Sequence, residues 1–149
     1  MSDKPVEIFD NIFRVGACQQ VNELYTNSYL MVDGDEGILF GPGSVIDFEE
    51  TFANITKIIP IEKLKYAVLH SQDPSICASL PLFEQNGFSG KIVTHMRTAY
   101  FVKHYGITSF FIYTNLAANR LILESGRVIY FMNTPYLKSA GSFMAYDNV

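Results

Sequence analysis

The sequence predicts a single α/β domain, and three observations lead to that prediction. The chain has 149 residues, a length that suits one domain better than two. Hydrophobic residues make up 48% and charged residues 17%, a balance that excludes a disordered chain and a coiled coil. Strand patterns come first, alternate with helix patterns in the middle of the chain, and return at its end, as expected for a sheet with packed helices.

Two hairpins are predicted in the N-terminal part. Asp10 and Asn11 are typical turn residues between two short apolar runs, and the Gly- and Asp-rich segment 33–37 separates two more. Gly and Pro residues at 41–44 then end the last of these strands. The four strands are expected at residues 6–9, 12–15, 28–32 and 38–40.

A helix is predicted after these hairpins. Four apolar residues recur at intervals of four, three and four, which places them on one face of a helix. Acidic residues fill the first turn, where the helix dipole favours negative charge, and Pro60 is expected to end the helix. The apolar face consists of Phe48, Phe52, Ile55 and Ile59.

The rest of the chain alternates between strands and helices. Residues 66–69 are all apolar, as in a strand buried on both faces, and His70 follows them. Residues 74–85 are expected to be helical, with Pro81 dividing them into two pieces. Further strands are expected at 91–94, 110–113, 121–123, 128–131 and 143–146, and a further helix at 98–105 with Gly106 as its cap.

Charge, hydropathy and cysteine spacing exclude several classes of protein. A net charge of −4 without a basic run argues against a nucleic-acid interface. No apolar run approaches 18 residues, so no membrane span is expected. The N-terminus has no apolar signal segment, which favours a cytoplasmic location. Cys18 and Cys77 form no CxxC pattern and are expected to be reduced thiols.

Chemistry is expected where predicted strands end, since ligands of layered α/β sheets bind at the carboxyl ends of strands. His70 and Asp73 follow one such strand, His95 follows another, and residues 134–138 follow a third. For His95 and His104 a structural, hydrogen-bonded histidine is the simpler interpretation. For His70 the nearby Asp73 keeps a functional role open.

Six segments form, in this order, a pattern that resembles a known family: residues 27–30, 33–40, 42–44, 69–74, 134–137 and 146–147. The pattern is similar to the metallo-β-lactamase-fold domain of flavodiiron proteins, above all to the flavin-free, oxygen-binding di-iron branch. The resemblance implies an αββα sandwich, of which residues 1–149 form a single partial domain, the N-terminal portion. It also implies two non-haem irons at the strand ends that bind or reduce dioxygen or nitric oxide, and no flavin domain.

Several ligand positions depart from the family pattern. His70 matches the first histidine of the H-x-E-x-D-H ligand motif, but Gln72 stands at its glutamate, and residues 74–75 lack its aspartate and second histidine. Lys138 follows Thr-Pro-Tyr-Leu, where relatives place another histidine, and Gly41 replaces the aspartate before Pro-Gly. An ammonium group repels a metal cation and Gln is a poor iron ligand. The ordinary di-iron site therefore cannot be built from this chain alone.

Three functions remain open at this stage. The first is handling of dioxygen or nitric oxide at an altered iron site, and the second is a metal-free interaction or signalling module. The third, a metal-dependent hydrolase, is weakest because serines at 71 and 75 replace the histidines that hold a catalytic zinc. The residues expected at the site are His70, Asp73 and His95 as metal ligands, and Gln72, Tyr136 and Lys138 as pocket lining.

A homodimer is also expected, besides a signalling or redox partner protein. A partial sandwich would leave an apolar sheet face uncovered, larger than monomers tolerate, so each chain is expected to cover the other's sheet. The alternative is that the C-terminal hairpins fold back and close the sandwich within one chain. The apolar residues expected on the sheets are Val68, Leu69, Ile92, Val93, Phe110, Phe111, Ile129 and Phe131.

Overall fold

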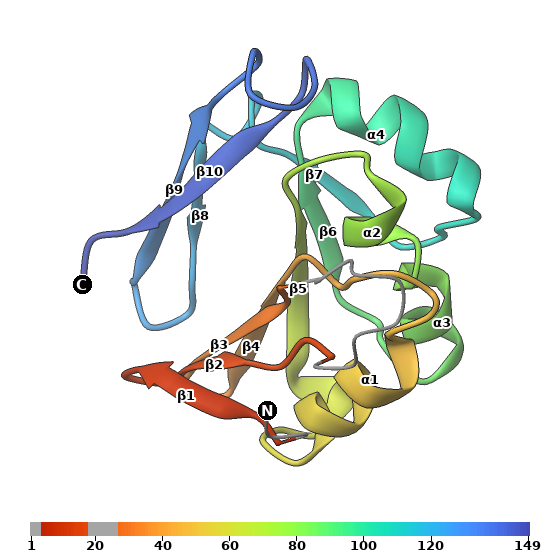
Figure 1. Ribbon diagram of the computed structural model, residues 1–149. Coiled ribbons are helices and arrows are strands. Elements are labelled where there is room, and N and C mark those ends of the chain that lie inside the picture. Colours follow the sequence, from red (N-terminus) through yellow and green to blue (C-terminus); the bar gives the residue numbers. More distant parts are fainter. Residues whose placement is uncertain (1–3, 18–26) are drawn as a thin grey trace.

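The computed structural model describes residues 4–17 and 27–149, and their strands form two sheets of seven and three strands (Figure 1). The first sheet runs in chain order from β1 to β7, and the second has the order β10-β9-β8. The first sheet contains β1 (Val6–Phe9), β2 (Ile12–Arg14), β3 (Tyr29–Asp33), β4 (Glu36–Phe40), β5 (Leu64–Leu69), β6 (Lys91–Thr94) and β7 (Phe111–Tyr113); the second contains β8 (Arg120–Ile122), β9 (Val128–Asn133) and β10 (Phe143–Asp147).

Helices cover one face of the first sheet, and the second sheet lies against its other face (Figure 1). The helices are α1 (Phe48–Thr56), η1 (Ile61–Lys63), α2 (Pro74–Cys77), α3 (Leu80–Gln85), α4 (Met96–Val102) and η2 (Lys103–Tyr105). The layers therefore follow the order helices, sheet, sheet, and the predicted α/β class is confirmed. None of the helices in the described part of the chain is long and apolar enough to cross a membrane.

The central strands β4, β5 and β6 of the first sheet are buried on both faces, which explains the all-apolar strand runs. Successive side chains of a strand point to opposite faces, so Leu69 packs under the helices while its neighbour Val68 faces the second sheet. Ile92 and Val93 divide in the same way. The helix-side core includes Leu30, Leu39, Ile55, Leu80 and Phe83, and the core between the sheets includes Met31, Ile38, Leu121, Ile129, Phe131 and Phe143.

The sandwich closes within one chain, so the predicted uncovered face is wrong. Val68 and Val93 are 1% and 0% exposed because β8–β10 fold back over them. Ile129 and Phe131 supply the covering side chains and are themselves buried. The alternative stated from the sequence, closure by the C-terminal hairpins, is the observed arrangement.

Two predicted helix boundaries near prolines are also wrong. The first helix ends at Thr56 instead of continuing to Pro60, and residues 57–58 form a turn. Pro60 disfavours helical geometry in Ile59, the residue directly before it. The segment 74–85 does consist of two helices, but the break lies at residues 78–79. Pro81 instead occupies the first turn of α3, where its missing N–H has no intrahelical partner to lose.

The predicted helix at 98–105 begins earlier, at Met96, and ends as 3-10 helix before Gly106. His95 is the reason for the early start, since its Nδ1 accepts a hydrogen bond from the Arg97 backbone N–H at 3.1 Å. Gly106 has φ of 86°, the left-handed conformation expected of a helix cap.

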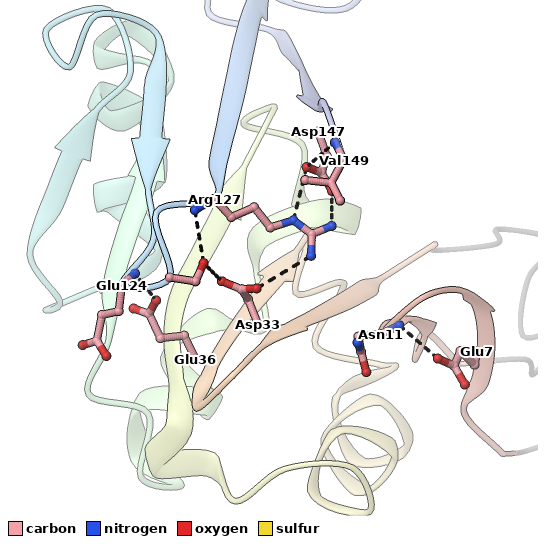
Figure 2. Close-up of polar contacts among 9 residues, drawn as sticks. Glu7, Asn11, Asp33, Glu36, Glu124, Arg127, Asp147 and Val149 are labelled. Carbon is pink, nitrogen blue, oxygen red and sulfur yellow. Dashed lines mark hydrogen bonds and ion pairs between the residues drawn. The ribbon is translucent and has the colours of Figure 1, made fainter.

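A partly buried polar cluster ties the two sheets together at the end of the sandwich where β3 meets β4 and β8 meets β9 (Figure 2). Arg127 lies 3.8 Å from Asp33 of β3 through Nη1, and its Nε and Nη2 donate to the Asp147 carboxylate of β10. The Glu124 backbone N–H donates to Glu36 Oε2 of β4 at 2.7 Å. We call these five residues the Arg127 cluster.

Candidate functional site

Three loops meet at the opposite end of the sandwich, where the parallel strands end. β4 and β5 end side by side, and the Gly41 N–H donates to the Val68 carbonyl at 3.0 Å. The next loop is joined by the Gly43 N–H, which donates to the Ile76 carbonyl at 2.9 Å. The Phe143 N–H reaches the His70 carbonyl at 3.4 Å, which brings the C-terminal segment to the same place.

A polar cavity of about 200 Å³ lies among these loops. Its lining combines one lysine, one histidine, two serines and one asparagine, a set rich in hydrogen-bond donors. The lining residues are Asn27, Ser28, Gly41, His70, Ser75, Ile76 and Lys138.

Lys138, which lines this polar cavity, forms an ion pair with Asp73. Lys138 Nζ lies 3.0 Å from Asp73 Oδ2. The other oxygen, Oδ1, accepts hydrogen bonds from the Ser75 N–H at 2.9 Å and hydroxyl at 2.7 Å. The hydrogen bonds from Ser75 and then Lys138 lower the pKa of Asp73 to about 2. Asp73 is therefore a carboxylate with both oxygens engaged.

The surroundings of His70 favour its neutral form. Burial, and secondly the positive charge of Lys138, lower the pKa of this imidazole below its ordinary value. A neutral imidazole offers one N–H donor and one acceptor nitrogen. Gly41 packs against it, since a Cβ at this left-handed position (φ +64°) would lie 3.4 Å from His70 Cε1.

Ser28 lines the polar cavity, and its hydroxyl is buried. The residue is 1% exposed, and its Oγ has no hydrogen-bond partner among the described residues. Buried polar side chains almost always have a partner, because an unpaired one costs desolvation energy. Among the residues that line the polar cavity, Ser28 is the one with a buried side-chain polar atom that lacks a partner in the described part of the chain.

A second, larger cavity opens beside the first, between the two sheets. Its volume is about 450 Å³ and we call it the apolar groove. Among the described residues only His70 lines both cavities. The groove is lined by Ile12, Tyr29, Met31, Phe40, Val68, His70, Ile129, Phe143, Met144, Ala145 and Asp147.

The loop that carries Lys138 is fixed at both ends. The Thr134 N–H donates to the Ser142 carbonyl at 2.8 Å, which closes the loop at its base. Thr98 of α4 donates its hydroxyl to the Gly141 carbonyl at 3.0 Å. A Cβ at Gly141 would lie 2.4 Å from Thr98 Oγ1, so the loop and helix are in direct contact.

The other predicted site residues lie around the cavity rather than in it. His95 follows β6 next to the end of β5, but its Nδ1 caps α4. Burial, and secondly the positive charge of Arg97, lower the pKa of this imidazole. The Gln72 carbonyl accepts a hydrogen bond from the Tyr105 hydroxyl at 3.1 Å. Tyr136 is 99% exposed and points to solvent. Of the predicted pocket residues, Lys138 lines the cavity.

Cys77 is a buried free thiol under the site. Burial, and secondly the charge of Asp73, raise the pKa of Cys77 to about 12, so the thiol stays protonated. It donates to the Asp73 carbonyl at 3.1 Å. Cys18, the other predicted thiol, lies outside the described residues.

The iron centre implied by the family resemblance does not fit the residues present. In residues 4–17 and 27–149 no group of three or more His, Cys, Asp or Glu side chains is placed to hold a metal ion. The Asp73 oxygens are taken by Ser75 and Lys138, and His95 has committed one nitrogen to its helix. The role of His70, Asp73 and His95 as ligands therefore stays a prediction, for which iron analysis is the test.

Sequence reasoning did not find the buried Ser28 hydroxyl or the apolar groove. Both arise where β3 begins and the second sheet folds over the first, so their lining residues lie far apart in the chain. Ser28 did stand in one of the segments that carry the family resemblance, but its partnerless state depends on packing.

The layered architecture, with its site at the strand ends, defines a protein of the metallo-β-lactamase fold class. The structure matches the flavodiiron protein of Giardia intestinalis with TM-score 0.82 and 19% identity, covering 96% of this chain and 37% of that one. It matches the FEZ-1 metallo-β-lactamase of Legionella gormanii with TM-score 0.76 and 18% identity, covering 97% and 57%. No curated protein sequence matches the chain.

The match to a peroxy di-iron species of the chemotaxis sensor ODP has TM-score 0.74 and 22% identity, and covers 97% of this chain and 59% of that one. The chain thus spans less than two thirds of each of these solved chains. Residues 24–149 match the family described as ODP family beta lactamase, so the chain belongs to the ODP family. The resemblance to oxygen-binding di-iron proteins is confirmed at the level of family and fold.

Proposed function

We propose that this chain is a metal-free ODP-family domain that works as a ligand-responsive interaction or signalling module. The ion pair of Lys138 with Asp73 carries the proposal, because it occupies the strand-end position where the family resemblance expects iron ligands. An ammonium held 3.0 Å from the carboxylate opposes binding of a second cation there.

A gas-binding iron site is the second candidate. Leu69 pairs with Thr94 across β5 and β6, so His70 and His95 follow neighbouring positions at one sheet edge. That placement favours iron held by these two histidines and Asp73, with dioxygen or nitric oxide as its ligand. Such a site requires Lys138 to leave Asp73, and His95 to bind through Nε2.

Iron content distinguishes these candidates. The purified chain is incubated anaerobically with ferrous iron, desalted, and its iron counted per chain by mass spectrometry. We expect well under one di-iron centre per chain, and a rise when Lys138→His is combined with Ser75→His. Two irons per chain in the unmodified protein would refute the proposal.

Two histidine variants locate any iron that does bind. His70→Ala should remove it, because His70 lies at the carboxyl end of a buried strand. His104→Ala is the matched control, since His104 is exposed on η2. Equal loss in both variants would contradict a site at His70.

We further propose a homodimer formed by the outer face of the second sheet. Cross-strand pairing places Met132 beside Met144 and Tyr130 beside Tyr146, and all four side chains are 38–53% exposed. A two-fold axis would pack this apolar stripe against its copy. Light scattering of the unmodified protein should give the mass of a dimer, and the double variant Met132→Glu with Met144→Glu should give that of a monomer. A monomer for the unmodified protein at micromolar concentration would contradict the proposed homodimer.

A cytoplasmic location is part of the proposal, and the free thiol of Cys77 supports it. A signalling or redox protein is the kind of partner such a module would contact.

A further inference from the structure

We propose that the polar cavity and the apolar groove together bind a small amphipathic carboxylate. The carboxylate would lie in the polar cavity beside Lys138 and Ser28, and the apolar body would extend into the groove between the sheets. This inference rests on the proposed metal-free function, because a metal ion at His70 and Asp73 would occupy the head-group position.

The two cavities adjoin at the ends of three strands. His70, directly after β5, lines both. Ser28 and Tyr29 are consecutive at the start of β3, one lining the polar cavity and the other the groove. Phe40 and Gly41 divide in the same way at the end of β4. A ligand that fills both must therefore pass the His70 imidazole.

The polar cavity supplies the donors that a carboxylate needs. Lys138 has three N–H groups and its side chain is 50% exposed, so donors remain beyond the one directed at Asp73. The Ser28 hydroxyl, without a partner in the described part of the chain, would donate to the ligand. His70 can add one N–H. Pairing the buried hydroxyl removes the cost of leaving it unsatisfied.

The charge balance favours a single negative charge. Asp73 lies against the same ammonium, so the cavity carries one cation already partly compensated by one carboxylate. A phosphate ester, which carries nearly two negative charges at neutral pH, would be repelled by Asp73 more than a carboxylate is. The head group is therefore a monoanion.

The groove selects an apolar body of limited length. Its volume of about 450 Å³ lies in the range of small-molecule pockets. Met31, Val68, Ile129 and Phe143 form its buried walls. Asp147, at the far end, is bonded to Arg127 and so closes the groove with a satisfied ion pair.

Calorimetry with three probes tests the proposal: octanoate, 1-octanol and acetate, each added to the full chain in EDTA. Octanoate has both head and body, octanol lacks the charge, and acetate lacks the body. We expect octanoate to bind about tenfold or more tightly than octanol, as a charge-assisted hydrogen bond would give, and acetate to bind least.

Matched variants locate the two halves of the ligand. Lys138→Met should weaken octanoate binding by about tenfold and octanol binding far less, and Ser28→Ala should weaken octanoate binding. Ala145→Phe fills the groove from an exposed position and should weaken both ligands. Lys91→Met, an exposed lysine at the other end of β6, should change neither.

Equal affinity for octanoate and octanol in the unmodified protein would overturn the proposal, as would an unchanged octanoate affinity in Lys138→Met. Iron counted in the same sample separates this inference from the proposed function. An iron-free chain that does not bind octanoate refutes the inference alone, whereas a chain with two bound irons refutes the metal-free function.

Discussion

The two ends of the sandwich differ in how their charged side chains are buried and paired. In the Arg127 cluster one guanidinium serves two carboxylates, and the ion-paired side chains are only 13–19% exposed. At the strand-end site Lys138 is 50% exposed and serves one carboxylate, while the Ser28 hydroxyl finds no partner in residues 4–17 and 27–149. The difference indicates that the first end holds the sheets together and that the second retains capacity to bind a ligand.

Removing the guanidinium should have the largest effect on stability. Arg127→Met leaves Asp33 and Asp147 partly buried without their cation, and we expect a loss of about 3 kcal/mol in the free energy of unfolding. Urea denaturation measures it, with Lys138→Met as the matched control at the exposed end. A loss for Lys138→Met as large as for Arg127→Met would contradict the contrast between the ends.

Removing the carboxylate of the strand-end site should have a smaller, pH-dependent effect. The pKa of Asp73 is about 2 in the folded chain against 3.8 ordinarily, so its stabilisation is complete above pH 3.8 and is lost as the pH falls through 2. Because Asp73 is partly exposed, we expect only about 1 kcal/mol between wild type and Asp73→Asn at pH 7. Urea titrations at pH 7, 4 and 2.5 should show this difference shrinking only below pH 4.

Asp10→Asn, in the exposed turn of the first hairpin, is the control for that titration. A difference between wild type and Asp73→Asn that grows as the pH falls would show that Asp73 is not stabilised as a carboxylate.

Two buried serines give the smallest and sharpest comparison. Ser79→Ala removes a hydroxyl that donates to the Pro42 carbonyl at 3.0 Å, and should cost about 1 kcal/mol. Ser28→Ala removes a hydroxyl with no partner in the described part of the chain, so unfolding free energy should change by less than about 0.5 kcal/mol. Equal losses in denaturant titrations would mean that Ser28 has a structural partner.

Local patterns in the sequence predicted the elements well where short-range physics decides them. The apolar face of α1 and the all-apolar run of β5 follow from the side-chain periods of helix and strand. Gly106 caps its helix because only its missing side chain makes the left-handed conformation inexpensive. The family resemblance, carried by six short segments, predicted the fold class.

The remaining features depend on contacts between distant residues. Glu124 and Glu36 are 88 residues apart in sequence, and no local pattern indicates that one binds the other. The position of His95 after a strand predicted a metal ligand, but its Nδ1 accepts a hydrogen bond from a nearer group, the backbone N–H of Arg97. The apolar strands led us to expect a homodimer, with closure within one chain as the alternative, and the packing of β8–β10 over the first sheet decides for the alternative.

The close approach of Gly141 to α4 bears on how the family's sequences can vary. Residues 135–138 are exposed, so most substitutions there change the loop's chemistry without moving its backbone. At 141 even a methyl group would lie 2.8 Å from the Thr98 backbone nitrogen and would push the loop away from the helix. In evolutionary terms, a substitution of Lys138 changes the strand-end chemistry on an unchanged loop, whereas a substitution of Gly141 also shifts the loop.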